Sequence, residues 1–155
     1  MSGKIEARLA ELGIELPPPA APAGSYVPAV QVGSLLMVSG QLPLRAGGLV
    51  YHGRVGAELT IGDGIAAARL CGLNLLAQVR AACGNDLDRV RRAVRLGGFV
   101  HAPSGFTDHP KVLNGASEQM TDVFGEAGRH ARFAVGAASL PLGAAVEVEA
   151  IFEIA

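Results

Sequence analysis

Apolar residues recur at helical spacing in three stretches of the chain. The first, over residues 3–13, places its apolar side chains on one face of a short helix that a glycine ends. The second, over residues 61–82, is preceded by Thr60, which together with Asp63 resembles a capping box. The third, over residues 108–124, opens with an aspartate and a proline and is followed by glycines. We therefore expect one short helix and two longer ones.

A second periodicity, the alternation of apolar and polar side chains, is clearest near the end of the chain. Over residues 144–154 every even position is apolar, whereas glutamates occupy three of the odd positions. Since neighbours along a strand point to opposite faces, one face of this strand is expected to pack on the helices. Looser alternation bounded by turn residues predicts five further strands, over residues 26–32, 35–39, 48–54, 90–101 and 132–138.

The order of these elements predicts the fold class. It indicates an α+β protein: a two-layer sandwich with a mainly antiparallel, six-stranded sheet and two helices on one face. We expect a single domain over residues 24–155, preceded by a helix and a proline-rich extension over residues 1–23. The polar second face of the last strand favours an oligomer in which another subunit covers the sheet.

Charge and composition narrow the classes of partner. The chain of 155 residues carries a formal net charge of −1, which favours neither nucleic acid nor an anionic membrane as a partner. Residues 16–44 are uncharged, but repeated prolines and glycines argue against a transmembrane helix there. A basic run near residue 90 is expected to be the polar side of a strand entry rather than a phosphate site: Arg89, Arg91, Arg92 and Arg95.

The cysteines and histidines show no metal-site spacing. Cys71 and Cys83 are twelve residues apart in a predicted helix, and no two of the four histidines are four residues apart. We expect two reduced thiols, no metal and no organic cofactor. The charged N-terminus lacks the apolar stretch of a signal peptide, so we expect a cytoplasmic protein.

Arg132 and Glu147 are the charged residues that most need explanation. Each lies on one of the last two predicted strands. The pair has two interpretations: an ion pair that stabilises the sheet, or a site that binds an anionic substrate and activates water. A serine hydrolase is not indicated, because Ser39 lacks the context of a nucleophile elbow.

Four sequence landmarks carry a resemblance to a known family. They are Gly24–Val27 (GSYV), Val38–Pro43 (VSGQLP), Asn114, and Ala131-Arg132 followed by Leu140-Pro141 and Val146–Ala150 (VEVEA). In this order and spacing the chain resembles the Rid (reactive intermediate deaminase) or YjgF family, also described as endoribonuclease L-PSP-like. The resemblance covers the chain from about Gly24 to Ile154.

The resemblance implies a fold, an assembly and a reaction. The implied fold is a chorismate-mutase-like sandwich, and the implied assembly is a homotrimer with ligand clefts between subunits. Arg132 would bind the substrate carboxylate, and Glu147 would position the water that attacks an imine carbon. The implied reaction is hydrolysis of 2-aminoacrylate-like enamines and imines to 2-keto acids and ammonia, that of a 2-iminobutanoate/2-iminopropanoate deaminase.

The resemblance also implies substrate-binding residues around this pair. They are Tyr26, Ser39, Gly40, Asn114, His130, Phe133 and Ala134. His130 and Phe133 are included for their place beside the arginine. From the residues alone, other roles stay open: Tyr26 as an interfacial aromatic, Ser39 and Gly40 as turn residues, Asn114 as a helix-packing residue, and His130 as a loop histidine.

The chain departs from the family pattern beside the arginine. His130 replaces a proline, Phe133 replaces a serine or threonine, and Gly136 replaces a glutamate, while the loop over residues 102–110 is longer than usual. A reshaped pocket is expected, which argues against the ordinary small 2-imino acids as substrates. The alternative is a non-catalytic trimer that binds a small carboxylate or regulates a partner. Ribonuclease activity, attributed to some relatives, fits poorly with the near-neutral charge and few aromatics.

Overall fold

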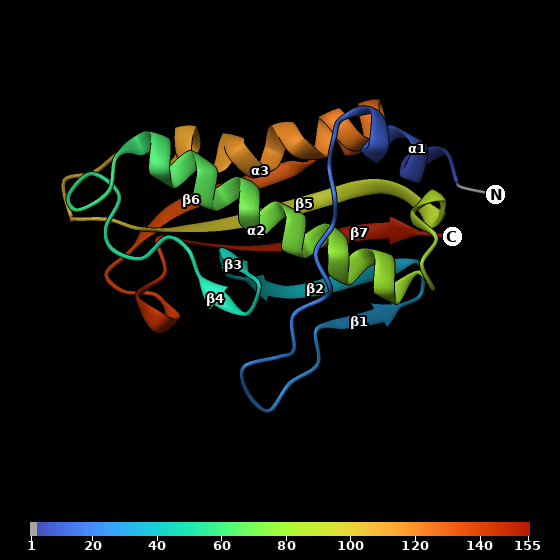
Figure 1. Ribbon diagram of the computed structural model, residues 1–155, viewed down its shortest axis with the longest axis horizontal. Helices are drawn as coiled ribbons and strands as arrows, with labels where there is room; N and C mark the ends of the chain where they lie inside the picture. The colour runs from blue at the N-terminus through green and yellow to red at the C-terminus, as the bar shows by residue number, and fades with distance from the viewer. Residues whose placement is uncertain (1–2) are drawn as a thin grey trace.

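The computed structural model describes residues 3–155 as helices packed on one face of a sheet (Figure 1). The helices are α1 (Lys4–Glu11), α2 (Ile61–Ala82) and α3 (His109–Phe124), with 3-10 turns at Leu87–Arg89, Gly125–Gly128 and Pro141–Gly143. The sheet strands are β1 (Ala29–Val32), β2 (Leu35–Gln41), β5 (Val90–His101), β6 (Ala131–Ala137) and β7 (Val146–Ile154). This arrangement confirms the α+β class.

The main sheet has five strands, not the six that we predicted. Its order is β1-β2-β7-β5-β6, and only the β5–β6 pair is parallel. The expected strand over residues 48–54 leaves the sheet, because β4 (Gly48–Leu49) pairs only with β3 (Leu44–Arg45) in a small hairpin. The residues after β4 bond to the segment before β7 instead, through Tyr51 and Gly53.

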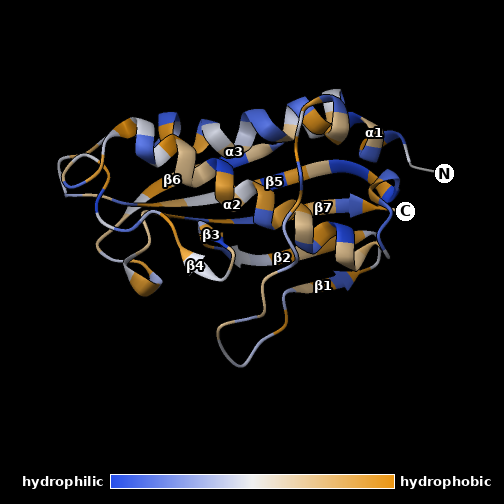
Figure 2. Ribbon diagram, viewed as in Figure 1, coloured by the Kyte–Doolittle hydropathy of each residue, from blue (hydrophilic) through white to orange (hydrophobic). Residues whose placement is uncertain are grey.

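The two long helices cover one face of the sheet (Figure 2), and the apolar side chains between the two layers are buried. The predicted capping box is present, since Thr60 and Asp63 exchange hydrogen bonds of 2.9 and 3.1 Å at the start of α2. The helices approach each other closely at glycines; a side chain at Gly115 would collide with the carbonyl group of Ile65. Even-numbered residues of β7 are buried against this layer, as its alternation predicted.

The opposite face of the sheet carries no helix and is partly polar. Arg95 on β5 forms a 2.6 Å ion pair with Glu149 on β7, and its guanidinium carbon lies 5.8 Å from the ring centre of Phe133. Arg89 donates to the carbonyl of Ala155 at 2.6 Å. These arginines of the basic run are thus held by the chain's own acceptors, in agreement with a structural role.

The N-terminal segment lies across the helical layer (Figure 1). Asp88 accepts hydrogen bonds of 2.8 Å from the backbone N–H groups of Lys4 and Ile5, and these bonds lower the pKa of its carboxyl. Further along, Gln78 of α2 donates to the carbonyl of Ala20 at 2.7 Å, which fixes the proline-rich stretch. Within residues 3–155, no helix combines the length and the apolar composition that a membrane span requires.

Candidate functional site

Arg132 lies on the edge strand β6 and points toward helix α3. Its register partner on β5 is Leu96, which is fully buried under the helices, so both side chains are on the helical side of the sheet. The guanidinium donates three hydrogen bonds: Nη1 to Asn114 Oδ1 at 2.9 Å and to Ser117 Oγ at 3.1 Å, and Nη2 to the carbonyl of Pro110 at 3.3 Å. Helix α3 therefore fixes the plane of this guanidinium.

His130 extends this network by one further step. Its Nδ1 lies 2.7 Å from the carbonyl oxygen of Gly128, and its Nε2 lies 2.9 Å from Ser117 Oγ. Because a carbonyl can only accept, Nδ1 donates to Gly128, and the contact of Nε2 with the Ser117 hydroxyl joins the ring to that serine. That hydroxyl oxygen in turn accepts from Arg132. His130 and Asn114 thus belong to one hydrogen-bond network with Arg132, and their expected part in substrate binding stays a prediction.

The charge of Arg132 is not neutralised within the part of the chain that the structure describes. Its three acceptors, on Asn114, Ser117 and Pro110, are uncharged, and it forms no ion pair with a residue of 3–155. Its Nε donates to none of them. A half-exposed guanidinium with unused donors and a fixed plane suits a carboxylate, which accepts two parallel charge-assisted bonds.

Glu147 lies on β7 and points to the face without helices. Its partner on β5 is Phe99, and its chain neighbours Val146 and Val148 are buried on the other side. Within residues 3–155 it accepts no hydrogen bond and forms no ion pair, and burial raises the pKa of its carboxyl. The carboxyl group packs against Gly40, where any side chain would collide with it. The glycine of the Ser-Gly-Gln motif thus makes room for this glutamate.

Ser39 and Tyr26 lie beside Gly40. Ser39 donates its hydroxyl proton to the carbonyl of Val27 at 2.8 Å, and so holds the loop that carries Tyr26. Tyr26 is 49% exposed, and its hydroxyl oxygen accepts from the backbone N–H of Ala23. Tyr26 and Gly40 line a small cavity of about 50 Å³. Among the predicted residues, Ser39 thus has an evident structural task.

The structure sorts the predicted residues into two groups. The arginine cluster comprises Arg132, Asn114, Ser117 and His130; the glutamate cluster comprises Glu147, Gly40, Ser39 and Tyr26. Because Arg132 is in register with a buried helix-side residue and Glu147 with Phe99 on the open side, these two charged side chains lie on opposite faces of the sheet. Within one chain, Arg132 and Glu147 therefore form neither an ion pair nor a joint site.

Phe133 and Ala134, the remaining predicted residues, also point to opposite faces. Phe133 is in register with Gly97 on the open face, where its ring packs edge-on against Phe99 at 5.5 Å between centres. It therefore does not crowd the guanidinium of Arg132 in the same chain. Ala134 points to the helical side, where it packs at the margin of the core.

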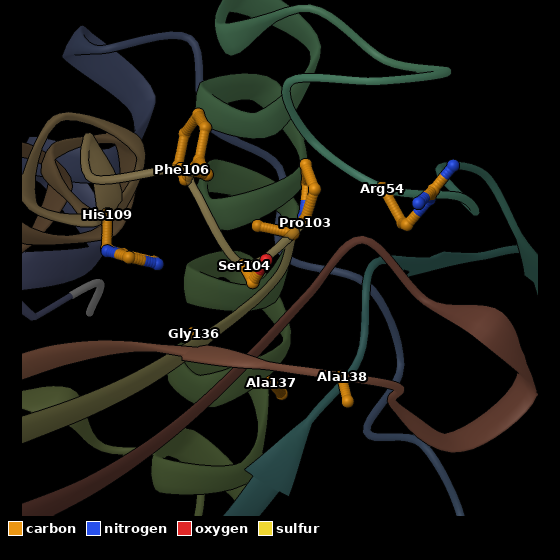
Figure 3. Close-up of a pocket in the computed structure, with 9 residues that line it drawn as sticks. Arg54, Pro103, Ser104, Phe106, His109, Gly136, Ala137 and Ala138 are labelled. Carbon is orange, nitrogen blue, oxygen red and sulfur yellow. The ribbon is translucent and has the colours of Figure 1, made fainter.

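A larger cavity, of about 550 Å³, lies at the far end of β6 (Figure 3). The loop after β5 contributes Ser104 and Phe106, the start of α3 contributes His109, and β6 contributes Gly136. Sequence reasoning noted the long loop and the unusual glycine separately, but not the cavity that they form. It also missed Ser117, which the three-residue spacing from Asn114 on one helix could have indicated.

The thiols and the possible metal ligands take no part in either cluster. Cys71 and Cys83 are free and buried, and burial raises the pKa of both thiols. In the described range, 3–155, no three side chains of His, Cys, Asp or Glu gather in a group that could hold a metal ion.

The fold is that of a chorismate-mutase-like sandwich. Residues 6–154 match the family described as "YjgF/chorismate mutase-like, putative endoribonuclease", and the chain belongs to this family. It is 53% identical over 154 residues to protein TCP17 of Trypanosoma cruzi, covering 99% of this chain and 96% of that protein.

Two solved structures illustrate the range of similarity. Protein Atu1372 from Agrobacterium tumefaciens, of unknown function, is 48% identical and superimposes with a TM-score of 0.91, covering 97% of this chain and 92% of that one. TdcF of E. coli, solved with bound serine, is 25% identical with a TM-score of 0.59, covering 89% of this chain and 93% of that one. The expected membership of the Rid/YjgF family is confirmed.

Proposed function

We propose that this protein is an imine deaminase that hydrolyses 2-aminoacrylate-like enamines and imines to 2-keto acids and ammonia. The observation that carries the proposal is the Arg132 guanidinium, held in a fixed plane by three uncharged acceptors and left without a carboxylate from residues 3–155. A relative solved with bound serine, TdcF, supports a small amino-acid-like ligand.

Arg132 would bind the substrate carboxylate. The Nε hydrogen and one of the two Nη2 hydrogens are unused within residues 3–155. The Nε–Nη2 edge of a guanidinium can pair with both oxygens of a carboxylate. The bonds to α3 hold that edge in place before the substrate arrives. The side-chain entropy lost on binding is therefore small.

Glu147 would activate the water. In the proposed reaction the water oxygen adds to the imine carbon while Glu147 accepts a water proton. With the imine bound as its protonated iminium ion, this addition gives a neutral amino alcohol. Glu147 then returns its proton to the nitrogen, the C–N bond breaks, and the hydroxyl proton passes to the departing ammonia as the carbonyl forms, so ammonium leaves. Burial raises the pKa of Glu147, which makes it a better base than an exposed glutamate. The net change is imine plus water to 2-keto acid plus ammonia, which requires neither metal nor organic cofactor.

We further propose that the two clusters meet across a subunit interface. YjgF family proteins are generally trimeric, and a cyclic trimer repeats one contact between unlike surfaces. The arginine cluster of one subunit would then face the glutamate cluster of its neighbour. This assembly explains how two groups on opposite faces of one sheet serve a single reaction.

The test is an assay in which an amino-acid oxidase generates the imine of alanine and semicarbazide competes for it. We expect the wild type to accelerate pyruvate release and Arg132→Ala to abolish that acceleration. Arg129→Ala is the matched control, because Arg129 lies three residues earlier with an ion-pair distance of 3.8 Å to Glu126 and a 74% exposed side chain. An Arg129→Ala variant as inactive as Arg132→Ala would count against the assignment.

A non-catalytic carboxylate-binding trimer is the second candidate, and the free guanidinium favours it equally. It predicts that pyruvate raises the melting temperature of the wild type, but not of Arg132→Ala, while no imine is hydrolysed. We expect no cleavage of RNA, because a chain of net charge −1 gains little from phosphate contacts. Two free, buried thiols fit the cytoplasmic location that we propose.

A further inference from the structure

The cavity of about 550 Å³ at the end of β6 is larger than a substrate as small as 2-iminopropanoate needs (Figure 3). Its wall combines apolar side chains, from Pro103, Phe106 and the alanines that follow Gly136, with the polar groups of Ser104 and His109. Arg54 lies at its rim, but Glu58 engages that guanidinium through bonds of 2.9–3.2 Å, so the rim offers no free positive charge. The cavity therefore suits a bulky group without charge.

Gly136 keeps this cavity open. A Cβ atom at position 136 would lie 2.7 Å from Nε2 of His109, closer than such atoms approach. The His109 ring packs edge-on against Phe106 with 5.2 Å between ring centres, so it forms one wall together with that ring. A branched side chain at position 136 would displace the imidazole and fill the space between β6 and the loop.

The cavity and the arginine lie on the same side of the same strand. Residues 132, 134 and 136 alternate to the helical face, which separates the ends of this row by ~13 Å at the usual rise of a strand. Between them lies Ala134, which is half-buried and does not itself line the cavity. The Arg132 guanidinium reaches the carbonyl of Pro110, the chain neighbour of His109, and so leans toward the cavity.

We propose that this cavity receives the substrate side chain and that the preferred substrates are 2-imino acids with a bulky uncharged side chain, such as an aromatic ring. This inference rests on the proposed function, since Arg132 must hold the carboxylate. The carboxylate end would lie at Arg132, the reacting carbon beside Ala134, and the side chain against Phe106 and His109. The glycine at position 136 would thus determine substrate size.

The test compares imines that an L-amino-acid oxidase generates from phenylalanine and from alanine. In Gly136→Val we expect hydrolysis of the phenylalanine-derived imine to fall at least about tenfold, with the alanine-derived imine changed less than about threefold. Gly48→Val is the matched control, because a side chain at that exposed strand position meets only a carbonyl at 3.8 Å. Equal losses for both imines, or no loss for the larger one, would overturn the proposal.

Two further measurements keep this test decisive. If Gly136→Val does not fold, Ala138→Leu narrows the same cavity from an exposed position and should show the same selectivity. If the wild type hydrolyses neither imine, the proposed function fails, and the cavity is tested by thermal shift with keto acids. Phenylpyruvate should then stabilise the wild type more than pyruvate does, and Gly136→Val should lose that difference. Equal stabilisation by both keto acids would refute the cavity assignment by itself.

Discussion

The arginine cluster and the glutamate cluster differ in how firmly hydrogen bonds hold their charged groups. Arg132 is fixed by three hydrogen bonds and supported through Ser117 by His130. Glu147 packs against the backbone of Gly40 and accepts no hydrogen bond from residues 3–155. An anion anchor gains from preorganisation, whereas a base gains from weak solvation, since either a bonded or a fully hydrated carboxylate would be a weaker base.

This difference predicts which substitutions should impair each cluster. The arginine cluster depends on geometry, so a substitution that keeps the charge but loses the planar fork should still impair it. The glutamate cluster depends on a proton acceptor, so a substitution that keeps the shape but loses the charge should impair it. Four predictions test this contrast.

The largest effect is expected for Glu147→Gln. The amide keeps the shape of the side chain but cannot accept the proton from water, so kcat should fall by ~1000-fold with KM little changed. In the wild type, kcat should fall as the pH drops through the raised pKa of Glu147, because the protonated carboxyl cannot act as the base. Steady-state kinetics across pH measures both. A variant that retains most of its kcat would show that water is activated elsewhere.

The next largest effect is expected for Arg132→Lys. An ammonium keeps the positive charge but cannot bond Asn114 and Ser117 while also holding both carboxylate oxygens. We expect kcat/KM to fall by ~100-fold, mainly through KM, with a melting temperature close to that of the wild type. A lysine variant with near wild-type KM would show that net charge, rather than the fork, binds the substrate.

A smaller effect separates the two clusters through a matched pair of serines. Ser117→Ala removes the link between His130 and Arg132, and Ser39→Ala removes one bond to the loop of Tyr26. Each loss should cost about 1 kcal/mol of stability. Ser117→Ala should raise KM severalfold, while Ser39→Ala should lower kcat at constant KM. The contrast fails if both variants change the same kinetic constant.

The smallest effect concerns stability: the ionised Glu147 that the proposed reaction needs should lower the free energy of unfolding. Because the pKa of Glu147 is raised in the folded state, the folded protein binds this proton more tightly than the unfolded chain does. Ionisation of Glu147 therefore costs stability at neutral pH, and that cost vanishes at pH values below the ordinary range of a glutamate. Glu147→Gln should melt a few degrees above the wild type near pH 7 and at the same temperature near pH 4. A variant that melts lower at neutral pH would contradict the assigned environment.

The sequence predicted the helices and strands better than it predicted which strands pair with one another. Helix α2 has the predicted bounds because Thr60 and Asp63 act within one turn, and the face of β7 follows from its strict alternation. The prediction of a sixth strand in the sheet was wrong. The residues after Leu49 were expected to join the sheet, but their hydrogen bonds go to the segment before β7. Local pattern does not specify which backbone groups meet across the chain.

The site was predictable as a set of residues but not as an arrangement. The motifs indicated Arg132 and Glu147, but their separation onto two faces depends on the register of β6 and β7 against β5. Ser117 joins the arginine only through the packing of α3 on the sheet. The cavity beside Gly136 depends on the path of the loop before α3, which no periodic pattern encodes.

The central claim is that one reaction uses Arg132 of one subunit and Glu147 of another. Inactive Arg132→Ala and inactive Glu147→Gln proteins should therefore be unfolded together in equal amounts, refolded and assayed for imine hydrolysis. In a randomly mixed trimer, about a quarter of the interfaces would pair an intact arginine with an intact glutamate, so activity should return to roughly 25% of the wild-type level. A mixed preparation with exchanged subunits that stays as inactive as its two parents would contradict the shared site.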